Sequence, residues 1–129
     1  MIKLHIIIGA FFCLTTVVLG AFGAHALKDI LDDYGQSVYN KAVLYQLFHG
    51  LGILIVAVLN GFINETNLSI IIYCFAIGIF LFSGSLYVLA LSKTKWLGVI
   101  TPFGGLFFIL GWGILILKLL KVWLNLGGL

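Results

Sequence analysis

The sequence predicts an all-α integral membrane protein: a four-helix bundle with a short amphipathic helix in the interface between the first two spans. Hydrophobic residues make up 63% of the 129 residues, and charged residues only 9%. A soluble domain carries about a quarter charged residues, because its surface faces water. The few charges here lie between four long apolar segments. Lipid is therefore the expected solvent for most of the exterior.

Each apolar segment is long enough for a membrane-spanning helix, which needs roughly 20 residues. The expected spans are about 4–24, 42–62, 68–91 and 101–122, within a single domain covering 1–129. The charges at the joints are Lys28, Asp29, Asp32, Asp33, Lys41, Glu65, Lys93, Lys95, Lys118 and Lys121. This segregation of charge is the strongest signal in the chain.

The first span has a competing interpretation as a cleaved signal peptide. Lys3 would supply the basic start, and the sequence AHA at 24–26 fits the small-x-small cleavage pattern. However, the apolar stretch is longer than the roughly 7–15 residues of a signal peptide. We therefore expect a retained helix.

The segment at about 27–34 is predicted to be the interfacial helix. Apolar residues recur there at helical spacing, with charged residues between them, which is typical of a helix lying in the interface. These apolar residues are Leu27, Ile30, Leu31, Tyr34 and Val38. Gly35 is expected to break the helix before the second span. The segment is interpreted mainly as a connector, and the alternative is a lid over a cavity.

The fourth span contains the only proline of the chain, Pro102. Thr101 followed by Pro102 suits an N-cap and first turn, because the amide that proline lacks has no partner there. The alternative is a helix that begins near Trp96 and kinks at Pro102. Lysines are balanced between the two ends of the predicted bundle, so the positive-inside rule assigns no orientation.

Hydrogen-bonding side chains collect in one leaflet, on all four spans. Their two interpretations are a polar pocket that admits a small amphipathic ligand, and a set of interhelical hydrogen bonds that only hold the bundle together. In the pocket interpretation, Gln46 and His49 project from one side of a helix, because they are three residues apart. The candidate ligand-binding residues are His25, Gln46, His49, Ser83, Ser85, Tyr87 and Thr101.

Small residues within the spans predict close helix packing, either within the chain or between chains. Gly20 and Ala24 form a small-xxx-small pair, and His25 is expected to close that contact at the water line. Glycines at 104, 105 and 111 lie at further packing positions. The predicted packing residues are Gly20, Ala24, Gly104, Gly105 and Gly111.

Several chemistries lack the residues that they need. No carboxylate lies within a span to complete a metal site or a proton relay, and no HExxH, CxxCH or nucleophile elbow occurs. Cys13 and Cys74 show no metal-ligand spacing and are interpreted as structural thiols. We expect no cofactor and no metal. Without a basic run, nucleic acid is not an expected partner.

Four stretches together resemble the domain-of-unknown-function 423 family of small bacterial membrane proteins, which is similar to eukaryotic transmembrane protein 256. They are GAFGAHAL at 20–27, YQLFHGLGIL at 45–54, FSGSLYVLAL at 82–91 and ITPFGGLFFILGW at 100–112. The resemblance implies a four-helix protein of the bacterial inner membrane, with no catalytic residues to carry over. Its motif positions include the polar residues named above.

The leading functional hypothesis is a non-enzymatic membrane protein that holds a lipid or another amphipathic molecule in the one-leaflet pocket. One alternative is a structural subunit that assembles with copies of itself, or with another membrane protein, through its glycine-rich faces. Another is a haem- or quinone-linked redox protein, favoured only by His25 and His49. Membrane lipids are thus the first expected partners.

Overall fold

The computed structural model describes residues 1–64 and 66–128. This part of the chain is helical and contains no strand. Glu65, one of the predicted joint charges, and Leu129 lie outside the described residues. The elements in chain order are α1 (Ile2–His25), α2 (Asp33–Phe62), α3 (Ser69–Ile79), η1 (Phe80–Gly84), α4 (Ser85–Ser92), η2 (Lys95–Val99) and α5 (Thr101–Asn125).

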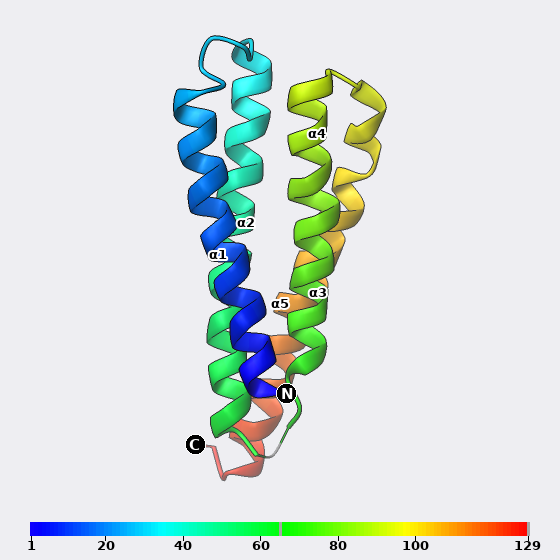
Figure 1. The fold of residues 1–129 in the computed structure, drawn as a ribbon. Coiled ribbons are helices and arrows are strands. Elements are labelled where there is room, and N and C mark those ends of the chain that lie inside the picture. The colour runs from blue at the N-terminus through cyan, green and yellow to red at the C-terminus, as the bar shows by residue number, and fades with distance from the viewer. Residues whose placement is uncertain (65, 129) are drawn as a thin grey trace.

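Within the described residues, four helical segments are long and apolar enough to cross a membrane, as the sequence predicts. The third crossing is α3, η1 and α4 in one continuous helix, in which η1 is a π-helical turn. Both described chain ends lie at the end of the bundle where α2 connects to α3, as Figure 1 shows. We call this the Asn60 end, and we call the opposite end, where α1 connects to α2, the Asp32 end.

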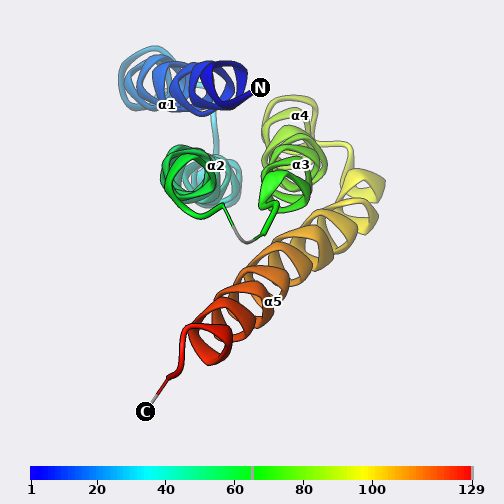
Figure 2. The same cartoon turned by 90° about the horizontal axis from the view of Figure 1, so that it is seen from below.

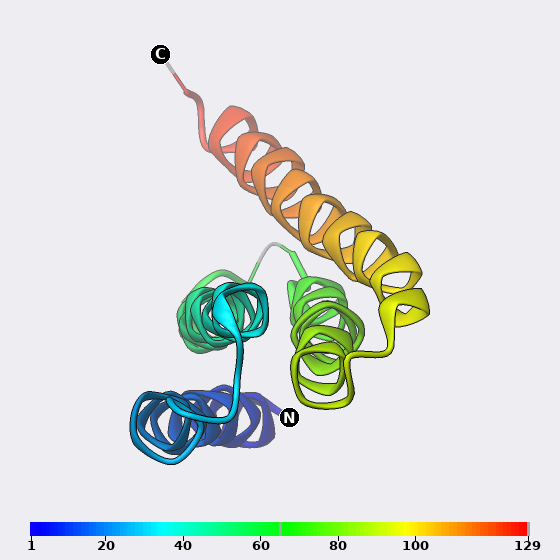
Figure 3. The same cartoon turned by 90° about the horizontal axis from the view of Figure 1, so that it is seen from above.

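The outer helices pack on a central pair. Helix α1 packs along α2, and α5 packs on α3. Seen along the bundle, α5 crosses obliquely on the side away from α1 (Figures 2 and 3). The helix α5 therefore has its neighbour in the third crossing, and much of α1 and α5 faces outward.

The connection between α1 and α2 is not the interfacial helix expected over about 27–34. It is a series of turns in which the Leu27 carbonyl accepts hydrogen bonds from the amides of Ile30 and Leu31, at 3.1 and 3.0 Å. Helix α2 begins already at Asp33, and Gly35 lies within its first turn. The predicted break at Gly35 is therefore wrong.

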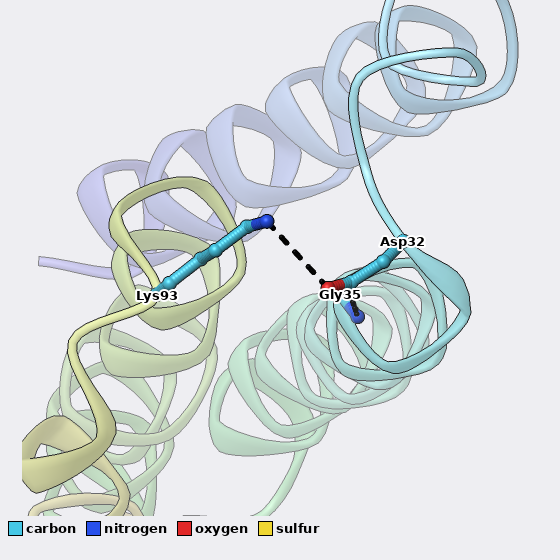
Figure 4. A network of polar contacts seen from close by, with 3 residues as sticks. All are labelled: Asp32, Gly35 and Lys93. Atoms are coloured by element: carbon cyan, nitrogen blue, oxygen red, sulfur yellow. Dashed lines mark hydrogen bonds and ion pairs between the residues drawn. The ribbon is translucent and has the colours of Figure 1, made fainter.

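The early start of α2 has a local cause. Asp32 is its N-cap, and its Oδ1 accepts a hydrogen bond from the Gly35 amide at 2.7 Å, which satisfies one of the unpaired donors at a helix start. The other carboxylate oxygen lies 3.6 Å from the Lys93 ammonium at the end of α4 (Figure 4). The cap and the ion pair join the two loops of the Asp32 end.

The Gly35 amide, assisted by Lys93, lowers the pKa of the Asp32 carboxyl. A lowered pKa in the folded state means that the ionised carboxylate stabilises the fold. This contribution is fully present above the ordinary carboxyl pKa, and it is lost as the pH falls through the lowered one. The ion pair itself is exposed to water and contributes little.

Helix α5 begins at Thr101 with Pro102 in its first turn, as predicted. The preceding residues form the short 3-10 helix η2, so the helix does not kink at Pro102. However, Thr101 does not act as the N-cap. Its hydroxyl oxygen lies 2.8 Å from the Ser85 hydroxyl of α4, and this hydrogen bond links the two helices.

Two of the predicted packing glycines, Gly104 and Gly111, are buried contacts within the chain. A Cβ at Gly104 would lie 2.4 Å from the Phe82 amide nitrogen, and one at Gly111 would lie 2.5 Å from the Phe75 ring. A Cβ at Gly20 would have one side-chain atom within 4 Å among the described residues, at 3.4 Å. A Cβ at Gly105 would lie 3.9 Å from the Phe82 ring.

Ala24 is exposed, so the predicted contact of the Gly20 and Ala24 pair is not formed as expected. The close approach on α1 is instead at Gly23. A Cβ there would lie 2.2 Å from the Tyr39 ring of α2. The preference for small residues near the end of α1 is therefore explained by a tyrosine side chain that occupies the space.

Replacing Gly104 by alanine should destabilise the bundle, because the new methyl group would collide with the backbone of η1. The expected loss is about 1–3 kcal/mol of unfolding free energy, as for other overpacked sites. Gly113→Ala is the matched control, because this position on the same helix has no neighbour within 4 Å. Denaturant unfolding in detergent micelles measures both variants. Equal stability of the two would contradict the close α5–η1 contact.

Candidate functional site

The predicted polar cluster is divided among several separate hydrogen bonds between helices. Gln46 of α2 is the most connected member. Its amide nitrogen donates to the Thr15 hydroxyl at 2.8 Å and to the Phe12 carbonyl at 3.2 Å, both on α1. Its amide oxygen accepts from the Tyr87 hydroxyl of α4 at 2.9 Å. Gln46 therefore ties three helices together and is 4% exposed.

The serines complete the connection to the third and fourth crossings. The Ser83 hydroxyl, on the π-helical turn, donates to the Ala42 carbonyl of α2 at 2.8 Å. The Ser85 hydroxyl lies 3.0 Å from the Phe82 carbonyl, besides its contact with Thr101. These side chains hydrogen bond to other groups of the described protein.

His25 does not join this network. It is the last residue of α1, it is exposed, and its side chain makes no hydrogen bond with any residue that the structure describes. The structure therefore does not place it as a plug on the Gly20 contact, and it separates His25 from the other candidate residues.

His49 faces away from Gln46, although three residues separate them. Its Nδ1 lies 2.8 Å from the Tyr45 carbonyl one turn earlier, and its Nε2 accepts a hydrogen bond from the Trp112 indole of α5 at 3.2 Å. Both contacts are satisfied when the proton is on Nδ1. The ring stacks on Phe108, with centroids 3.4 Å apart and planes inclined by 7°. Gln46 thus joins α2 to α1 and α4, whereas His49 joins α2 to α5.

A groove of about 540 Å³ opens beside His49, between α2 and α5. It exists because α5 packs on α3 and has little contact with α2. The lining is mostly aromatic, and we call it the lateral groove. Its residues are Leu44, Tyr45, Phe48, His49, Phe82, Gly105, Phe108, Ile109 and Trp112. Of the predicted ligand-binding residues, only His49 lines it.

Tyr45 provides the one hydroxyl group of the groove. Its ring stacks on Phe82 with centroids 4.4 Å apart, and its hydroxyl has no hydrogen-bond partner among residues 1–64 and 66–128. Tyr45 lies one turn after the exposed Lys41, so it is about 6 Å further along the helix axis. Among the described residues, the hydroxyl is thus a free donor on a mostly aromatic surface.

No three His, Cys, Asp or Glu side chains come together as a metal site anywhere in the described residues. Cys13 and Cys74 are both free. The two histidines of the redox hypothesis have different surroundings, because both nitrogens of His49 are engaged by protein atoms while His25 is exposed.

Sequence reasoning overlooked Tyr45 and Trp112 as site residues. Trp112 carried a signal, because tryptophan in a membrane protein prefers the two interfaces, and this one lies near the middle of its span. A buried indole usually needs a hydrogen-bond acceptor, and the acceptor here is His49. Tyr45 lies in the stretch YQLFHG, but nothing in the sequence distinguishes its free hydroxyl from a paired one.

Comparison with known proteins gives one consistent family. A family model described as a protein of unknown function (DUF423) matches residues 19–105. UPF0382 membrane protein SH2409 of Staphylococcus haemolyticus is 47% identical over 92% of this chain and 97% of its own length. UPF0382 membrane protein SSP2132 of Staphylococcus saprophyticus is 42% identical over 93% of this chain and 99% of its own length. No solved structure significantly matches the chain.

Tyr87→Phe should weaken the bundle, because the Gln46 amide oxygen would lose its donor. Hydrogen bonds between membrane helices contribute about 0.6–1.7 kcal/mol, and a loss in this range of unfolding free energy is expected. Tyr34→Phe removes an exposed hydroxyl of α2 and is the control. The unfolding free energies of both variants can be measured in mixed micelles. Equal values for the two variants would contradict the hydrogen bond between Tyr87 and Gln46.

Proposed function

The chain belongs to the DUF423 family of proteins of unknown function, and we propose that it binds a membrane amphiphile in the lateral groove. The observation that carries this proposal is the aromatic groove itself, about 540 Å³ in volume, with one unpaired hydroxyl at Tyr45. The proposed ligand has a hydrocarbon chain and a hydrogen-bond acceptor, such as the ester carbonyl of a lipid.

The position of the groove supports a ligand that arrives from the bilayer. The groove lies on the side of two membrane-spanning helices, so hydrocarbon chains rather than water are its surroundings. His49 adds no demand for a polar partner, because both of its ring nitrogens are engaged. Its stacked pair with Phe108 and the Trp112 indole form a rigid, apolar wall against which a chain can pack.

The polar end of the ligand is assigned to the Asp32 end of the groove. The Tyr45 hydroxyl would donate to the acceptor of the ligand, and Lys41 lies one turn closer to the interface. A lipid in this orientation would place its carbonyl near Tyr45 and its chain along Phe48 and Phe108. The hydrogen bond would fix the depth of the ligand, and the aromatic surface would supply most of the binding energy.

Localisation in the bacterial plasma membrane, as a multi-pass protein, is part of this proposal. The relatives are bacterial proteins named as membrane proteins, and the four crossings suit the thickness of a bilayer. A binding role rather than an enzymatic one is supported by the His49 contacts, because the lone pair of its Nε2 already accepts the Trp112 indole proton while Nδ1 faces a carbonyl.

The two other hypotheses have less support. Assembly through Gly104 and Gly111 competes with their contacts to Phe82 and Phe75 within the same chain. A haem or quinone held by both histidines would require His49 to release Trp112 and the exposed His25 to come close. We therefore give priority to the groove.

Gly105→Leu should close the groove, because a Cβ at this position has room and a leucine side chain would extend into the space beside Phe82. A phospholipid with a photoactivatable acyl chain, added to the protein in nanodiscs, is expected to cross-link to peptides containing Phe48 and Phe108. In the variant this labelling should fall about tenfold, corresponding to a loss of about 1.4 kcal/mol. Tyr45→Phe should reduce the labelling about threefold, because it removes one hydrogen bond with the free energy typical of those between membrane helices.

The controls are Gly113→Leu, at an open position on the same helix, and Tyr73→Phe, a half-exposed tyrosine outside the groove. Both should label as the wild type does. Undiminished labelling of Gly105→Leu would overturn the proposal. A change in oligomeric mass of Gly105→Leu, measured in the same nanodiscs, would instead assign the groove to a second copy of the chain and also overturn it.

A further inference from the structure

We propose a second binding site, for a phosphate group, in a polar pocket at the Asn60 end. The pocket has a volume of about 660 Å³ and lies where the start of α1 meets the connection between α2 and α3. The side chains that argue for it are Lys3, Asn60, Asn67 and Ser69. It shares no lining residue with the lateral groove and does not depend on it.

The first argument is a buried hydroxyl without a partner. Ser69 is 7% exposed and lines the pocket, and its Oγ has no hydrogen-bond partner among the described residues. An unpaired buried donor costs about 1–3 kcal/mol. It is therefore rare unless a water, an ion or a ligand completes it.

The second argument is that two asparagine side chains of the lining offer hydrogen-bond donors to the pocket. The Asn60 side-chain oxygen accepts from the Leu68 amide at 2.6 Å, and the Asn67 side-chain oxygen accepts from the Ser69 amide at 2.8 Å. With both amide oxygens committed to the backbone, the NH₂ groups remain as donors without partners in the described structure. A group that only accepts hydrogen bonds, such as a phosphate, is complementary to this arrangement.

The third argument is charge. Lys3 belongs to the pocket lining. The Lys118 ammonium lies at the rim, where it donates to the Asn67 carbonyl at 2.6 Å and approaches the Thr66 hydroxyl at 3.4 Å. No carboxylate is present among the described residues of the lining; Glu65 of the same loop lies outside them. Two ammonium groups beside amide and hydroxyl donors favour an anion.

The site lies at the level of the membrane interface, because it is built from a helix start and an interhelical connection. Phosphate at this level comes either from a phospholipid headgroup of the adjacent leaflet or from free inorganic phosphate. Both present the same oxygens to the pocket. They differ in whether an acyl chain has to accompany the phosphate.

The test is native mass spectrometry of the full chain carrying Gly105→Leu, so that the lateral groove does not contribute an adduct. Phosphatidylglycerol is the probe, and a diacylglycerol with the same acyl chains is the phosphate-free comparison. One phosphatidylglycerol per chain should be retained, and the diacylglycerol should not. Adding Ser69→Ala or Lys3→Gln should weaken retention about tenfold, the effect of one hydrogen bond to a charged group.

Lys121→Gln is the matched control, because it removes the same charge from the same end of the bundle without touching the pocket. Its retention should equal that of the parent. Equal losses in Lys3→Gln and Lys121→Gln, or no loss in Ser69→Ala, would overturn the site in favour of general attraction to the surface. Lys3 is exposed, so its variant tests the site even where Ser69→Ala alters the fold.

A competition with inorganic phosphate separates the two sources. Displacement of phosphatidylglycerol by millimolar phosphate would identify free phosphate as a sufficient ligand. Retention of the lipid against phosphate, together with loss in Lys3→Gln, would identify the phospholipid headgroup. Retention of the diacylglycerol as strongly as phosphatidylglycerol would overturn the proposal.

Discussion

The lack of water in the hydrocarbon core is the constraint on which this structure depends. A polar side chain at membrane depth has to find its partner within the protein, because an unpaired group there costs several kcal/mol. Gln46 meets this condition with Thr15 and the Phe12 carbonyl on α1, and with Tyr87 on α4. Because these bonds have defined directions, they fix the rotation of α2 against two neighbours and not only its distance from them.

The same constraint leads to the lateral groove. Gly104 brings the backbone of α5 against η1, and Ser83 of η1 is bound to the Ala42 carbonyl of α2. Helix α5 is thus held close to the third crossing and diverges from α2. The links across the groove are made by side chains, because the Trp112 indole donates to His49 and Phe108 stacks on the same ring. A groove results because the small residues draw α5 to one partner, and only side chains of α5 reach the other.

The four crossings could be predicted from the sequence because hydrophobic length and the placement of charge follow directly from the bilayer. The start of α5 at Thr101 was predictable for a similarly local reason, the tolerance of a first turn for Pro102. The turn at 27–32 was not, because its amphipathic spacing equally fits a helix. The start of α2 was decided by one side chain, since Asp32 is its extended N-cap and a helix cannot continue from 27 through 32 to 34.

The candidate site was harder to predict, because a sequence shows which groups can hydrogen bond but not which are already paired. Gln46, Ser83, Ser85 and Thr101 have the composition of a pocket, yet each is engaged by another part of the protein. His25 is a polar residue that was expected to pack and is instead exposed. Its place at the end of a span did not decide between the two. Partner choice depends on helix rotation, which periodicity alone does not fix.

Unpaired groups are therefore more informative here than polar groups as such. The hydrogen bonds of Gln46 and His49 are already made, so a ligand would gain little from them and would have to break a tie between helices. The Tyr45 and Ser69 hydroxyls have no such commitment among the described residues, and they lie in two separate recesses, the first on the side of the bundle and the second at the Asn60 end. A ligand that accepts a hydrogen bond gains it at these positions without cost to the fold. At the groove and the pocket, a ligand can therefore bind without taking hydrogen bonds away from the fold.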